Sequence, residues 1–241
     1  MSFLNDVLNI FIKYYPQLLT GVGNTVLIAL TSTVAGLALG LLTGVVRTAP
    51  MSKNPILRAL HKLLNAIIAI YVEIFRGTPM MVQSMVIYWG YAFATGGDTL
   101  PLIPSGILIV SINTGAYMAE TVRGGIVSID PGQTEGAKAI GMNHWQTMLH
   151  VILPQALRNI VPTLLSQMIT TIKDSSYMAS LVTVELMACT KLIISKANAY
   201  NGTWVDRFNR GTIHVTDVFV LFGFAFLAYF AINFTLSCLV R

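Results

Sequence analysis

Polar residues at helical spacing stand out in this 241-residue chain, because most of their surroundings are apolar. Asn113, Tyr117 and Glu120 fall at i, i+4 and i+7, so a helix would place them on one face. A carboxylate beside an amide and a phenol suits an ammonium group, and an ionisable residue at membrane depth is a functional candidate by default. The alternative is a structural ion pair of Glu120 with Arg123 or Arg76.

A second candidate site is the stretch Arg76-Gly77-Thr78-Pro79. A proline after a glycine frees backbone groups from helical pairing, and at membrane depth such groups face protein or a cavity. Arg76 can meet a substrate carboxylate in a forked geometry, and Thr78 and Gln83 are candidate polar contacts beside it. The alternative is an arginine that snorkels over a kink. A third candidate is the pair Lys173-Asp174, whose alternative role is mutual charge neutralisation.

Catalytic and metal-binding patterns are missing from the sequence. The nearest approach to a phosphate-binding loop is Gly132-x-x-x-Gly136-Ala137-Lys138, which has the wrong spacing and lacks the hydroxyl residue. No set of His, Cys and carboxylate residues has the spacing of metal ligands, and the two cysteines indicate no disulfide framework. We therefore expect neither an enzyme nor a metal or nucleotide site in this chain.

The composition is that of a multi-pass membrane protein. Hydrophobic residues make up 54% of the chain and charged residues 10%, and the mean hydropathy is +0.68. The net charge of +5 does not indicate nucleic acid binding, because the basic residues lie in loops beside apolar segments. We expect the chain to contact membrane lipid and not nucleic acid.

The apolar pattern predicts an all-α single transmembrane domain over residues 1–241. A ~30 Å hydrocarbon layer needs about 20 apolar residues per helix. The predicted spans are about 21–46, 77–97, 102–119, 157–172 and 218–240.

Two further segments and the topology complete this prediction. Residues 1–20 are expected to form a separate amphipathic helix at the membrane surface, and 173–215 a partly re-entrant or interfacial helix followed by an extracytoplasmic loop. The basic loop at 47–62 places that side in the cytoplasm, with the N-terminus outside and the C-terminus inside. Gly36, Gly40 and Gly44 form a small-residue stripe that lets another helix pack closely, and it offers one possible contact to a second copy of the chain or to a paralogue.

The stretch 130–141 predicts a short soluble helix between two membrane spans, in which the helix itself covers residues 131–141. Asp130 is a good N-cap, Pro131 suits the first helical position, and Gln133 is placed to reach back to the cap. Gly141 then ends the helix. A docking helix of this kind predicts a soluble partner.

This stretch resembles the EAA loop of bacterial ABC-importer permeases, the element that couples to the ATPase subunit. The matching residues are Glu135-Gly136-Ala137, then Gly141, and nine residues later Val151-x-Leu153-Pro154. The departures are Gly136 in place of the second Ala and Val151 in place of Ile. The resemblance implies that the ATPase-coupling residues are Glu135, Gly136, Ala137, Gly141, Leu153 and Pro154.

Over about residues 18–240 the chain resembles the polar amino acid ABC permeases, which include histidine, arginine, glutamine and cystine importers. This resemblance rests on the stretch 76–79, on Asn113-x-Gly115-Ala116-Tyr117-x-Ala119-Glu120, and on Lys173-Asp174-Ser175-Ser176, where the family often has Thr at the position of Ser175. It implies the five-helix type I ABC importer permease fold in a bacterial plasma membrane, and transport by alternating access.

The implied partners are an ATPase subunit that carries ATP and Mg²⁺, a second permease subunit that is either a copy or a paralogue, and an extracytoplasmic amino-acid-binding protein. The residues leave two alternatives open. One is an ion-coupled secondary carrier with Glu120 and Asp174 as proton or cation sites, and the other is a membrane anchor for a cytoplasmic enzyme.

Overall fold

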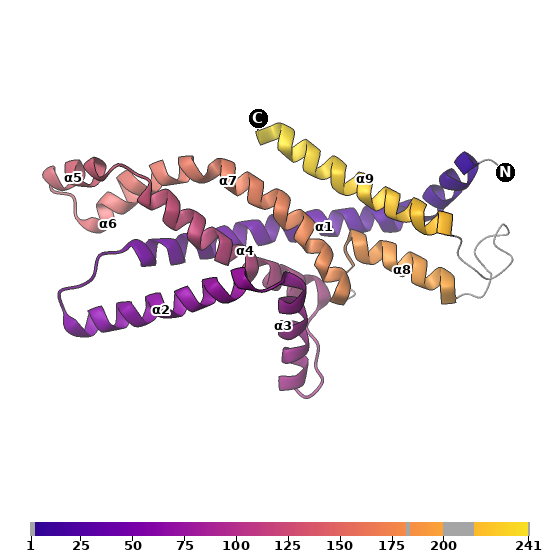
Figure 1. The fold of residues 1–241 in the computed structure, drawn as a ribbon, viewed down its shortest axis with the longest axis horizontal. Coiled ribbons are helices and arrows are strands. Elements are labelled where there is room, and N and C mark those ends of the chain that lie inside the picture. Colours follow the sequence, from indigo (N-terminus) through magenta and orange to yellow (C-terminus); the bar gives the residue numbers. More distant parts are fainter. Residues whose placement is uncertain (1–2, 182–183, 200–214, 241) are drawn as a thin grey trace.

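The computed structural model describes residues 3–181, 184–199 and 215–240, and every regular element in these ranges is helical (Figure 1). In chain order the elements are α1 (Phe3–Thr48), α2 (Pro55–Gly77), α3 (Met80–Ala94), α4 (Leu102–Val127), α5 (Pro131–Ala139), α6 (His144–Thr147), the π-helix η1 (Met148–Ile152), α7 (Leu153–Asp174), the 3-10 helix η2 (Ser175–Leu181), α8 (Leu186–Ala199) and α9 (Val215–Val240).

Five stretches of the described residues are long and apolar enough to cross a membrane. They are Ile10–Thr48, Pro55–Gly77, Leu102–Val127, His144–Ser195 and Val218–Cys238. The first, third and fifth overlap the predicted spans 21–46, 102–119 and 218–240, and the fourth contains the predicted span 157–172.

The centre of the molecule is formed by α1, α4 and α7, which pack against one another (Figure 1). Their shared core includes Val122 and Ile126 of α4, Ala156 and Ile160 of α7, and the side chain of Leu41 on α1. The short helices α5 and α6 lie at one end of the long axis and the N-terminus lies at the other (Figure 1). The coupling stretch is therefore presented at an end of the bundle.

The glycine stripe of α1 is covered by α4 of the same chain. A Cβ atom added at Gly36 would lie 2.8 Å from Thr114, and one added at Gly44 would lie 2.7 Å from Val122. Gly40 faces Met118 in the same way. The stripe therefore does pack against a helix, as predicted, but its partner is α4 and not a second permease.

The N-terminal residues do not form a separate surface helix, which corrects that prediction. They continue without a break into α1, whose 46 residues would span about 69 Å and include Pro16. Ile10 and Leu18 are buried in a cluster with Leu186 of α8 and Leu221 of α9. This packing extends the helix beyond the apolar span that the sequence pattern delimited.

The second span lies earlier than predicted. The structure does break the helix at 77–79, but the part after the break, α3, has only 15 residues and turns away from α2 (Figure 1). The part before it, α2, has 23 residues and is the one long and apolar enough to cross a membrane. The sequence pattern placed the span after the break, where no charged residue occurs, whereas α2 carries four charged residues that all lie on one face, as shown below.

The segment 173–215 is described only in part. Residues 175–181 form η2 and 186–199 form α8, which packs on α1 and α9. Residues 182–183 and 200–214, on which the predicted extracytoplasmic loop falls, lie outside the described residues.

Candidate functional site at the α2–α4 seam and the coupling end

The break between α2 and α3 is stabilised by the side-chain amides of two buried residues, Gln83 and Asn113. Pro79 has no N–H to donate to the carbonyl of Phe75, four residues earlier. Gln83 Nε2 donates to that carbonyl at 2.9 Å and to the Thr78 carbonyl at 2.8 Å. Asn113 Nδ2 on α4 donates to the Gln83 side-chain oxygen at 2.8 Å and to Phe75 O at 3.3 Å.

Three of the predicted site residues, Thr78, Gln83 and Asn113, are thus brought together. Gln83 Nε2 also contacts the Thr78 hydroxyl at 2.9 Å, and Gln83 and Asn113 are buried. Their amide hydrogens satisfy carbonyls that the proline leaves unpaired, which is a structural task. Substrate contact by these three residues stays a prediction.

Arg76 and Tyr117 meet beside this amide network. The Arg76 guanidinium carbon lies 5.8 Å from the centre of the Tyr117 ring, within the range of a cation–π contact. Nearby, the Tyr71 hydroxyl donates to the carbonyl of Ile112 at 2.6 Å and so fixes α2 against α4. Arg76 is exposed, so its guanidinium is open to a carboxylate partner.

Glu120 lies between two arginines. One carboxylate oxygen pairs with Arg47 of α1, and the other accepts a bond from Arg123 Nε at 2.9 Å. The predicted alternative of an ion pair with Arg123 is therefore present in the structure, whereas Arg47 was not foreseen. Tyr117, one turn earlier on α4, connects Glu120 to Arg76, and this line of side chains on α1, α2 and α4 is called the seam below.

Lys173 and Asp174 lie apart from the seam, at the end of α7. Lys173 is exposed and Asp174 is half-buried, and among the described residues neither makes an ion pair or a hydrogen bond to the other candidate residues. Near this end, α7 and α4 are linked by the hydroxyls of Thr171 and Thr114, which lie 3.4 Å apart. The predicted site therefore falls into two parts.

The coupling helix α5 is closed by its own ends. Asp130 Oδ1 accepts a bond from Gly132 N at 2.6 Å, as an N-cap does. At the other end the amide of Met142 donates to Ala137 O and the amide of Gly141 to Lys138 O, both at 3.0 Å, which is a Schellman motif. Gly141 has φ +83°, a value that glycine adopts without strain.

Two features of α5 differ from the prediction. Its helical body is Pro131–Ala139, so Gly141 lies just beyond the helix, at the C′ position. The side chain of Gln133 accepts a bond from Gln155 Nε2 at 3.1 Å, at the start of α7. Of the motif residues on α5, Glu135 and Gly136 are exposed and Ala137 is buried.

The Leu153-Pro154 part of the motif explains the π-helix η1. Because Pro154 has no N–H, the carbonyl of His150 four residues earlier receives no bond from it. The amide of Leu153 instead donates five residues back, to Met148 O. Before η1, Asn143 and Gln146 form a capping box that starts α6, with both bonds at 2.9 Å, and the sequence analysis missed it.

A cavity of about 270 Å³ lies behind the coupling helix. It is lined by residues of α1, α4, α5, α6 and η1 and of the turns after α1 and α4: Thr48, Pro50, Ile126, Ile129, Thr134, His144, Thr147, Met148 and Ile152. The coupling end is therefore packed loosely against the bundle on this side.

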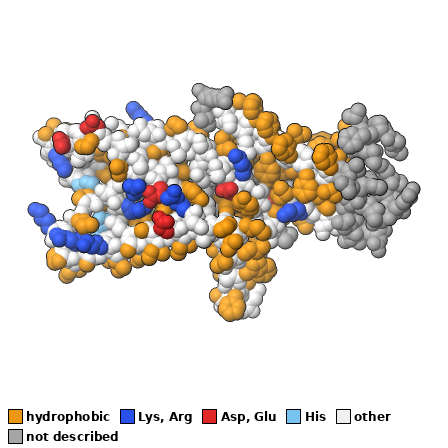
Figure 2. Space-filling view, viewed as in Figure 1, with side chains coloured by type: hydrophobic (Ala, Val, Ile, Leu, Met, Phe, Trp, Pro, Cys, Tyr) orange, Lys and Arg blue, Asp and Glu red, His pale blue; other side chains and the backbone are white. Residues whose placement is uncertain are grey.

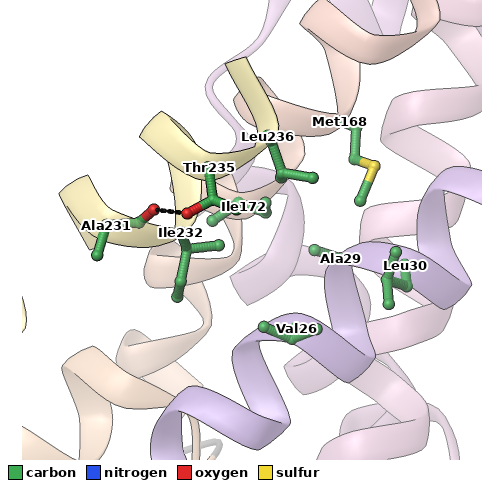
Figure 3. Close-up of a pocket in the computed structure, with 9 residues that line it drawn as sticks. All are labelled: Val26, Ala29, Leu30, Met168, Ile172, Ala231, Ile232, Thr235 and Leu236. Carbon is green, nitrogen blue, oxygen red and sulfur yellow. Dashed lines mark hydrogen bonds between the residues drawn. The ribbon is translucent and has the colours of Figure 1, made fainter. Parts of the chain in front are cut away.

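A second cavity, of about 430 Å³, lies between α1, α7 and α9 and has an apolar lining (Figure 3). The hydroxyl of Thr235 is bound at 2.8 Å to the carbonyl of Ala231 in its own helix (Figure 3). A polar amino acid would find no convergent polar groups there, so this cavity is a poor substrate site.

The sequence analysis did not select Glu185, which is fully buried. Its carboxylate accepts bonds from the amides of Met187 and Ala188 at 2.8 and 2.7 Å and from the Tyr229 hydroxyl at 2.8 Å. Thr25 on α1 accepts from the next amide, Leu186 N, at 3.1 Å. Glu185 thus joins α8 to α9 beside α1. Tyr229 is 44 residues away in the chain, so no local pattern indicates this role.

Among the described residues, no group of three or more His, Cys, Asp or Glu side chains could hold a metal ion. The polar groups of the seam can bind charged solutes and fix helices, and the coupling end offers an exposed helix to a partner.

Comparisons with known proteins agree with this geometry. Residues 36–241 match the family described as "Binding-protein-dependent transport system inner membrane component". The L-cystine transport system permease protein TcyB of Bacillus subtilis is 36% identical over 174 residues, which cover 72% of this chain and 69% of that protein. The glutamine transport system permease protein GlnP of Escherichia coli is 34% identical over 171 residues, covering 71% and 74%.

Solved structures share the fold. A chain in the crystal structure of an amino acid ABC transporter with histidines is 28% identical, with a TM-score of 0.74, over 100% of this chain and 96% of that one. A chain of the inward-facing MetNI methionine ABC transporter is 20% identical, with a TM-score of 0.67, over 95% and 97%.

Proposed function

The chain belongs to the family of inner membrane components of binding-protein-dependent transport systems, and from that premise we propose that it imports a polar amino acid. It is a multi-pass permease subunit of the type I ABC importer fold, not an enzyme, and permeases of this kind work with an ATPase. The observation that carries the amino acid assignment is the match to TcyB and GlnP, which are permease proteins for cystine and glutamine.

ATP and Mg²⁺ bind, in this proposal, to a separate ATPase subunit that docks on α5 through the exposed Glu135 and Gly136, while Ala137 of the same motif is buried. The two capped ends make α5 a rigid unit, and it is joined to α4 and α7, which both enter the bundle core. Movement of α5 with the ATPase is thereby passed to α4, which carries the seam, and opens the pathway alternately to each side. Gly141, Leu153 and Pro154 set the direction of the connecting segments.

The substrate contacts belong to the same proposal. Arg76, Tyr117 and Glu120 are the leading candidates, because they line the seam, while Asn113, Thr78 and Gln83 hold its backbone. Lys173 and Asp174 are more distant candidates at the end of α7. A second permease subunit and an extracytoplasmic amino-acid-binding protein complete the assembly.

The proposed orientation has the N-terminus outside and the C-terminus in the cytoplasm. It is supported by the basic residues around the turn from α1 to α2, namely Arg47 at the end of α1, Lys53 in the turn and Arg58 and Lys62 near the start of α2, and by the position of α5 at the same end of the bundle (Figure 1). An ATPase could reach α5 only from the cytoplasm.

Copurification tests this proposal against the ion-coupled alternative, which the relatives and structures described above do not support. A tagged chain solubilised from its native membrane should bring an ATPase of the ABC class with it, identified by mass spectrometry. Vesicles that contain the chain alone should show no amino acid flux under a proton or sodium gradient. Gradient-driven flux without a bound ATPase would contradict the proposal.

A further inference from the structure

All four Lys, Arg, Asp and Glu side chains of α2 lie on one side of that helix. At about 100° per residue, Arg58, Lys62, Glu73 and Arg76 fall within a sector of about 60°, and all four are exposed. Ala69 lies within the same sector. This charged sector runs along most of α2.

The large exposed aliphatic residues of α2 occupy a different sector. They are 42–76% exposed and fall within a sector of about 140° that does not overlap the charged sector: Ile56, Leu57, Leu60, Leu63, Leu64, Ile67, Ile70 and Ile74. Such a surface suits lipid. Charged side chains cost much more free energy in contact with lipid than aliphatic ones do, so the charged sector must face water, protein or both.

The space-filling view shows where this charge lies. Basic and acidic side chains gather on the side of α2 that is turned toward the bundle, while hydrophobic side chains follow its outer edge (Figure 2). At the end of this sector, Arg76 contacts the ring of Tyr117 on α4. One turn further along α4, Glu120 pairs with Arg123 and with Arg47, so the charged side chains extend from α2 across α4 to α1.

The charged sector and the seam together carry more positive than negative charge. Their basic side chains are Arg47, Arg58, Lys62, Arg76 and Arg123, and their acidic ones are Glu73 and Glu120. The glutamate of the seam is already shared by two arginines. Among the described residues Arg58, Lys62 and Arg76 make no ion pair, so positive charge dominates, and it attracts a carboxylate and repels a cation.

We propose that the charged sector of α2 lines a water-filled route, and that this route favours solutes with a free carboxylate and no net positive charge. The inference rests on the proposed function in one respect, namely that a solute crosses the membrane through this subunit. Neutral and acidic amino acids meet the description, and basic ones do not. Glu73 and Arg76, one turn apart on α2, are the pair that a zwitterion would meet.

Cysteine labelling in native membranes tests this route without any transport assay. In a background with Cys189 and Cys238 replaced, Ala69→Cys places a thiol in the charged sector, and Ile70→Cys places one in the aliphatic sector. Ala69 is half-buried and Ile70 is 60% exposed in the isolated chain, so exposure alone favours labelling of Ile70→Cys. The proposal predicts the reverse for an anionic methanethiosulfonate reagent, 2-sulfonatoethyl methanethiosulfonate.

The sign of the local charge is read from a second reagent. The ratio of the rate for this anionic reagent to that for the cationic trimethylammonium analogue, normalised to their reaction with free 2-mercaptoethanol, should be about threefold or more at Ala69→Cys. Adding Arg76→Gln should lower the ratio, and adding Glu73→Gln should raise it.

Two results would overturn the inference. If Ala69→Cys reacts no faster than Ile70→Cys, the sector is covered by lipid or by another protein chain and lines no aqueous route. If the normalised ratio is one or less, the preference for carboxylate solutes is refuted. Neither result depends on whether the ATPase copurifies, so failure here is separate from failure of the proposed function.

Discussion

The coupling helix α5 and the α2–α3 break both lie between longer helices, but the hydrogen bonds that fix them differ in how far apart their partners lie in the chain. The caps of α5 join residues two to five positions apart, from Asp130 to Gly132 and from Ala137 to Met142. The break is fixed by Gln83, which bonds to residues five and eight positions away, and by Asn113 of α4, which bonds to residues 30 and 38 positions away. A segment closed by its own neighbours can move as a unit, whereas the break can open only if α4 releases it.

The two regions also differ in what a lost side chain leaves behind. Removing an exposed cap leaves backbone groups that water can reach. Removing a buried amide leaves carbonyls without any partner, and each buried unsatisfied group costs about 1–3 kcal/mol. The seam should therefore be sensitive to stability losses, and the coupling end to losses of function.

The largest effect is expected for Gln83→Leu. The carbonyl of Thr78 would lose its side-chain donor, that of Phe75 would keep only the longer bond from Asn113, and Asn113 would lose its acceptor, at a combined cost of roughly 2–5 kcal/mol. Thermal unfolding of the purified protein in detergent measures this as a clear drop in Tm. Gln133→Leu, at an exposed position of the coupling helix, is the matched control and should leave Tm nearly unchanged.

A smaller effect is expected for Glu120→Gln. The neutral amide cannot pair with both Arg47 and Arg123, and because the group is partly exposed the loss should be about 1–2 kcal/mol. We expect amino acid uptake to fall while the ATPase still copurifies. Unchanged uptake would remove Glu120 from the substrate contacts and leave it a structural role between the arginines.

The smallest stability effect is expected for Gly141→Ala. The methyl group meets open space, but a residue with a Cβ at φ +83° costs about 1 kcal/mol. Gly136→Ala, at a helical position that also faces open space, should not destabilise and serves as the control in the same unfolding assay. If both variants unfold alike, the left-handed turn at Gly141 does not matter to the fold.

Local signals predicted the coupling end well. Asp130, Pro131 and Gly141 are recognisable from their own neighbours, and the structure uses Asp130 and Gly141 as a cap and a helix stop. Even here the partner of Gln133 was misjudged, because Gln155 lies 22 residues on and comes near only through the turn between α5 and α7.

The seam was predicted less well, because its contacts join distant segments. The helical spacing placed Asn113 and Glu120 on one face of a helix, but it could not show that Asn113 bonds to Gln83 while Glu120 pairs with Arg47, 73 residues away. The second span was misplaced for a related reason. A count of the charges along α2 does not show that Glu73 and Arg76 lie on one side of the helix. That becomes clear only when the residues are placed around the helix axis.

ATP-driven uptake in proteoliposomes tests the central claim most directly. The vesicles should contain this chain with its copurified ATPase, its amino-acid-binding protein and ATP, in the absence of ion gradients. The account predicts that labelled glutamine or cystine accumulates with the unaltered chain, and that Glu135→Lys abolishes accumulation while ATP hydrolysis continues. Accumulation that is unaffected by Glu135→Lys, or that proceeds without ATP, would contradict it.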